Sequence, residues 1–117
     1  MAVFSLGKVV VAAAGTPVAI TTNLSTSNSK LNAAGVLTCY SLIVQPLSSN
    51  VGKVYIGTST MSRTTLAGVF LYVPIPTANS LPIEMFRNET AQAAFSATDI
   101  YVDADNANDG VLAHVIR

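Results

Sequence analysis

The sequence predicts an all-β protein, a single β-sandwich or jelly-roll-like domain of about seven to nine short antiparallel strands with little helix. Apolar residues recur mostly at every second position, which is the period of a half-buried strand. The apolar runs are short, and clusters of Gly, Pro, Asn, Ser and Thr separate them. Such clusters form turns and loops, so the chain reads as many strands joined by tight connections.

The first half of the chain contains four predicted strands. A turn at 15–17 joins the first two, and the Ser/Thr/Asn-rich segment 23–32 predicts an exposed loop. Pro46 ends the long third strand, because proline cannot donate a hydrogen bond to the ladder. The short connection that follows predicts antiparallel pairing with the fourth strand. These four strands span 8–14, 17–22, 36–45 and 51–57.

The second half contains a polar loop at 58–66 and then further strands. The segment 88–97 is the one predicted helical turn, with Asn88 as its N-cap. The last two strands are joined by the Asn/Asp-rich segment 105–109, which predicts a closing hairpin. The predicted strands of this half are 67–75, 81–86, 98–104 and 110–117.

Composition predicts one domain over residues 1–117 that belongs to an assembly. The chain is 50% hydrophobic and only 10% charged, with a net charge of zero, whereas ordinary domains carry roughly 25% charged residues. High hydrophobicity argues against disorder, and the lack of a basic surplus argues against nucleic-acid binding. A small, apolar, uncharged domain tends to associate, so we expect a homo-oligomer.

The charge is unevenly divided along the chain. Residues 1–83 contain four basic residues and no acid, whereas residues 84–117 contain all six acidic residues and two arginines. Either strands from both halves interleave and cancel the asymmetry in space, or a basic patch on one subunit faces an acidic patch on the next. The second arrangement would fix orientation more than it adds affinity.

No motif in the chain predicts catalysis or a cofactor. The segment 103–110 resembles a calcium loop, but Ala107 stands where the EF-hand pattern needs an oxygen ligand. A different calcium site built from Asp103, Asp105 and Asp109 stays open, although a turn is favoured. A hydrolase would need His114, the only histidine, as its base, and no nucleophile elbow accompanies it.

Targeting and redox features are equally sparse. Cys39 is the only cysteine, which predicts a small buried apolar side chain. The N-terminal apolar stretch contains Lys8 and lacks a basic n-region, so we expect no signal peptide. No apolar run reaches the length of a membrane span, and no membrane partner is expected.

Three segments together resemble small virion structural proteins of tailed bacteriophages. These are the Gly-Thr-Pro-Val-Ala-Ile-Thr segment at 15–21, the Val-Gly-Lys-Val-Tyr-Ile-Gly-Thr-Ser-Thr segment at 51–60 and the Thr-Asp-Ile-Tyr-Val-Asp-Ala-Asp segment at 98–105. The segment 61–68 departs from that pattern, because an Asn-Gly turn and a Leu-x-Pro-Gly step are replaced by Met-Ser-Arg-Thr-Thr-Leu-Ala-Gly.

The resemblance implies a non-enzymatic capsid cement or decoration protein. Such a protein is commonly a homotrimer seated on the major capsid protein, so it would lie on the capsid surface of the virion after synthesis in the host cytoplasm. Two alternatives remain: a neck, tail or baseplate component of the same virion, and a receptor- or glycan-binding module at a fibre tip. The glycan alternative predicts aromatic side chains in long loops, and the loops 23–32 and 57–66 hold none.

Two segments are candidate contacts with partners. Residues 1–7 are apolar and lack turn residues, which predicts an N-terminal arm that docks on a neighbouring subunit or the shell. The strand around Phe70 is the candidate for contacts within the oligomer, and either of its faces could be core. The candidate interface residues are Met1, Val3, Phe4, Arg63, Phe70, Leu71 and Tyr72.

Overall fold

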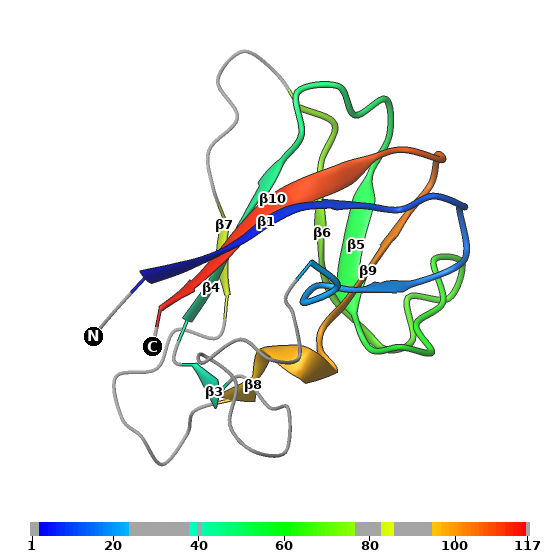
Figure 1. The fold of residues 1–117 in the computed structure, drawn as a ribbon. Helices are drawn as coiled ribbons and strands as arrows, with labels where there is room; N and C mark the ends of the chain where they lie inside the picture. Colours follow the sequence, from blue (N-terminus) through cyan, green and yellow to red (C-terminus); the bar gives the residue numbers. More distant parts are fainter. Residues whose placement is uncertain (1–2, 24–37, 40, 77–82, 86–94, 117) are drawn as a thin grey trace.

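The computed structural model describes residues 3–23, 38–39, 41–76, 83–85 and 95–116. These residues form an all-β sandwich of two antiparallel sheets with almost no helix, as the sequence predicts (Figure 1). Seven of its strands are at least three residues long, which agrees with the expected number. A small third sheet pairs β3 (Thr38–Cys39) with β8 (Phe95–Ser96) beside the main sandwich.

The first sheet has β10 near its centre. Its spatial order is β1 (Val3–Val10), β10 (Gly110–Ile116), β4 (Ser41–Pro46) and β7 (Ile83–Met85). The first and last strands of the chain therefore lie side by side, with Val3 opposite Ile116, and both chain ends emerge from the same side of the sandwich (Figure 1). A register shift between Ser5 and Gly7 interrupts the pairing of β1 with β10.

The second sheet has the order β2 (Val18–Ala19), β9 (Tyr101–Ala104), β5 (Val54–Gly57) and β6 (Val69–Val73). Strand β6 is its longest edge strand, and a register shift places two β6 residues, Val69 and Phe70, against Gly57. An alanine at Gly57 would place its Cβ in contact with the backbone carbonyl of Gly68, so only glycine allows this close approach.

One apolar core fills the space between the two sheets. Each strand contributes alternate side chains, because successive residues of a strand point to opposite faces. The fully buried members from the first sheet include Leu6, Leu42 and Val111, and those from the second include Ile56 and Val102. Cys39 also lies in this core with no exposed surface, in line with its interpretation as a small apolar side chain.

Strand pairing differs from the sequence expectation, because several neighbours in sequence belong to different sheets. The segments 36–45 and 51–57 do not pair: β4 lies between β10 and β7, while β5 lies between β9 and β6. The predicted closing hairpin is also wrong, since β9 and β10 are in opposite sheets and the segment 105–109 crosses between them. The short connections therefore link layers rather than adjacent strands.

Two local predictions need correction. Residues 3–7 are not a separate arm, because they form the first part of β1 and pair with β10 of the same chain; residues 1 and 2 lie outside the described part. Of the predicted helical turn at 88–97, residues 88–94 lie outside the described part, Phe95–Ser96 is strand β8, and a 3-10 turn occupies Ala97–Asp99. In the part of the chain that the structure describes, no helix has the length and apolar character of a membrane span.

Candidate functional site

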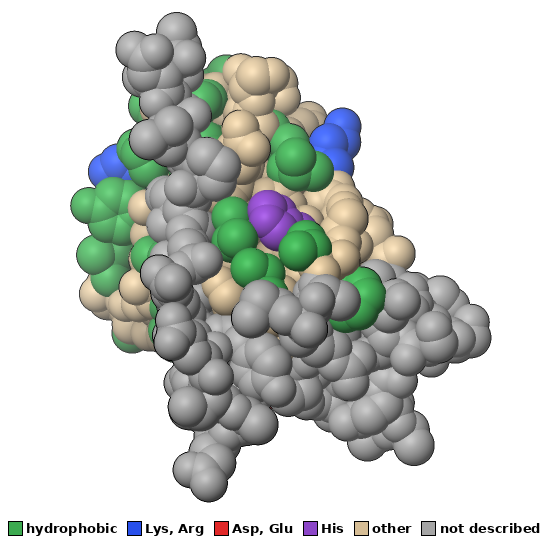
Figure 2. Space-filling model, turned by 90° about the vertical axis from the view of Figure 1, so that its left-hand side faces the viewer, with side chains coloured by type: hydrophobic (Ala, Val, Ile, Leu, Met, Phe, Trp, Pro, Cys, Tyr) green, Lys and Arg blue, Asp and Glu red, His purple; other side chains and the backbone are tan. Residues whose placement is uncertain are grey.

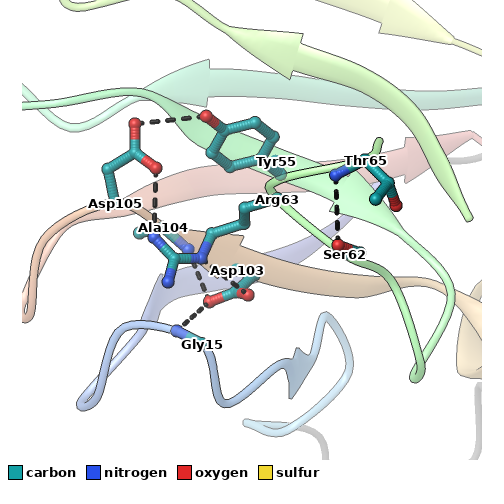
Figure 3. A network of polar contacts seen from close by, with 8 residues as sticks. All are labelled: Gly15, Tyr55, Ser62, Arg63, Thr65, Asp103, Ala104 and Asp105. Atoms are coloured by element: carbon teal, nitrogen blue, oxygen red, sulfur yellow. Dashed lines mark hydrogen bonds and ion pairs between the residues drawn. The ribbon is translucent and has the colours of Figure 1, made fainter. Parts of the chain in front are cut away.

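A buried aspartate on β9 holds two loops against the outer face of the second sheet. Asp103 is 1% exposed, and its Oδ1 accepts hydrogen bonds from the backbone N–H groups of Gly15 (2.9 Å) and Ala104 (2.8 Å). Arg63 reaches over from the loop between β5 and β6, with its Nε 3.4 Å from Oδ2 of Asp103 (Figure 3). A buried carboxylate is costly without hydrogen-bonding or charged partners. Asp103 finds them in the loop that contains Gly15 and in the loop that contains Arg63, so its contacts anchor both loops to β9.

The same arginine also contacts the more exposed Asp105. Its Nη1 lies 3.1 Å from Oδ1 of Asp105, while Oδ2 of that carboxylate accepts a hydrogen bond of 3.1 Å from the hydroxyl of Tyr55 (Figure 3). Burial of the ring raises the pKa of Tyr55, and the hydrogen bond to Asp105 and its negative charge raise it further. Both effects disfavour the phenolate.

A second buried aspartate, Asp109, closes the other end of the acidic loop. Its two carboxylate oxygens accept hydrogen bonds of 2.9 to 3.1 Å from the backbone N–H groups of Val51 and Gly52. Asn50 exchanges two hydrogen bonds of 2.8 Å with the backbone of Gly110. Asn50 is a common turn-forming residue type, and nothing in the sequence indicates that its side-chain amide joins this turn to β10.

The three aspartates do not point toward a common centre. Asp103 contacts Gly15, Ala104 and Arg63, Asp109 contacts residues 51 and 52, and Asp105 contacts Tyr55 and Arg63. Among the described residues, no group of three or more His, Cys, Asp or Glu side chains could hold a metal ion. The contacts of these aspartates are with backbone amides, a guanidinium and a phenol, so the acidic segment joins parts of the fold together.

The β6 surface, defined here as Phe70, Tyr72 and Ile75, is an apolar area on the second sheet. The first two side chains point away from the core and are each 48% exposed, and Ile75 is 53% exposed. The ring of Tyr72 lies 6.0 Å from that of Tyr55, and Nζ of Lys53 lies 5.0 Å from its centroid. These contacts hold one ring of the surface in place, which favours a preformed contact area.

The β10 face is a second apolar area, on the outer side of the first sheet. It surrounds His114, which is half-buried on β10 and lies opposite Ser5 of β1 and Ile43 of β4. Figure 2 shows the histidine, in purple, flanked by hydrophobic side chains. Its apolar members are exposed or half-buried, and they are Val3, Val10, Ile43, Leu112 and Ile116.

The predicted interface residues divide between core and surface. Val3 is 65% exposed on β1, whereas Phe4 packs against the core, and Met1 lies outside the described residues. On β6 the outward side chains are those of Phe70 and Tyr72, while Leu71 packs against the core. The structure therefore assigns the two faces of β6 that the sequence leaves open. Phe4 and Leu71 are half-buried against the core, and the role of all these residues in an interface stays a prediction.

Arg63 has contacts within its own chain. Its guanidinium joins Asp103 of β9 to Asp105 of the loop that follows, so a basic residue of the first half of the chain meets acids of the second half in one molecule. At this position, then, charges from the two halves of the chain pair within one molecule. This favours the interpretation in which strands of both halves interleave over the one in which a basic patch faces an acidic patch on another subunit. The guanidinium of Arg63 is thus ion-paired within its own chain, and 29% of the side chain is exposed.

No known protein family, curated protein or solved structure matches this chain.

Proposed function

We propose that this chain is a non-enzymatic structural subunit of a virion, of the capsid cement or decoration type. In this role it associates with copies of itself and bridges copies of the major capsid protein on the capsid surface. The proposal starts from the resemblance of three sequence segments to phage structural proteins, and the small sandwich is compatible with it.

One observation carries the proposal: apolar side chains are exposed on both outer layers of the sandwich. The β10 face lies on the first sheet and the β6 surface on the second, so the two areas face away from each other across the core. A bridging subunit needs at least two contact areas, and large exposed apolar areas mark interaction sites. A low content of charge is compatible with interfaces whose centres are depleted of charged residues.

Cryo-electron microscopy of virions from the genome that encodes this chain tests the proposal. The matched control is the particle made without the chain, so that a difference map reveals only its density. Density on the outer shell at symmetry-related seams between capsomers is the expected result. An axial ring would instead indicate a neck or tail component, density at a fibre tip would indicate a receptor-binding module, and equal maps would contradict a virion role.

A further inference from the structure

We draw no further inference here: the strongest candidate, the β10 face around His114 on the outer side of the first sheet, is an apolar area of exposed and half-buried side chains, and nothing in the part of the chain that the structure describes shows what covers it.

Discussion

At the scale of single residues, the aspartates of the C-terminal segment organise loops rather than present ligands. Asp103 and Asp109 are both almost fully buried, and each accepts hydrogen bonds from backbone amides of a loop that is distant in sequence. Hydrogen bonds to a charged acceptor are worth ~1.5–3 kcal/mol when the group is buried, and much less when water competes. Burial therefore decides which of these similar residues matter for stability.

Asp103→Ala and Asp105→Ala test this difference as a matched pair. Asp103→Ala leaves the amide of Gly15 without its acceptor and removes the more buried partner of Arg63, so we expect the free energy of unfolding to fall by about 2–3 kcal/mol. Asp105→Ala removes a more exposed ion pair with Arg63 and the hydrogen bond that Tyr55 donates, and we expect a smaller loss of about 1 kcal/mol. Urea unfolding measures both values, and equal losses would contradict the role assigned to burial.

Tyr55 gives a prediction for alkaline pH. Its pKa in the folded state is raised above the unfolded value of 10.0, so the folded protein retains this proton after the unfolded chain has lost it. The resulting stability is complete below pH 10 and is lost as the pH rises toward the folded-state pKa, by up to about 1.4 kcal/mol per pH unit.

Tyr55→Phe is the control for that dependence. The variant lacks the ionising group but keeps the ring, and the other three tyrosines of the chain remain in both proteins. We expect unfolding measured at several pH values above 9 to show a shallower loss of stability in Tyr55→Phe than in the unmodified protein. If the free energy of unfolding falls equally steeply with pH in both proteins, ionisation of Tyr55 does not contribute to the loss of stability.

At the scale of elements, β1 is part of the sandwich and not an appendage. It pairs with β10 along its length and places Leu6 and Val9 in the core. The apolar composition of residues 1–7 predicts a docking arm, but of the described residues 3–7 only Leu6 is buried, and the strand that they pair with is the last strand of the same chain. Sequence cannot show this pairing, because the paired residues of the two strands are 100 or more positions apart, from Val10 and Gly110 outward.

Deletion of residues 1–7 separates the two interpretations of this segment. As part of β1, the segment contributes the burial of Leu6, which alone is worth ~1.5–3 kcal/mol, together with strand hydrogen bonds. We therefore expect the truncated protein to melt at a clearly lower temperature, or to be unfolded, in the absence of any partner. An unchanged melting temperature of the isolated chain would instead restore the interpretation as a docking arm.

At the scale of the whole molecule, tertiary structure brings together charges that the sequence separates. All six acids lie after residue 83, and the loop that carries Arg63 folds across to two of them. What remains exposed includes apolar side chains on both outer layers of the sandwich. The low charge of the chain and these two areas lead to the same expectation, that the protein works in contact with other subunits.

The sequence by itself determined the class of fold, the approximate position of most strands that the structure describes, and the burial of Cys39. These are local properties, set by an alternation of apolar and polar residues and by turn-forming clusters. Only the tertiary structure decided which strands pair, that 105–109 crosses between sheets, which face of β6 is outside, and which aspartates are buried. Those outcomes depend on contacts between distant segments, and residues such as Asp103 and Asp105 differ only in the surroundings that such contacts create.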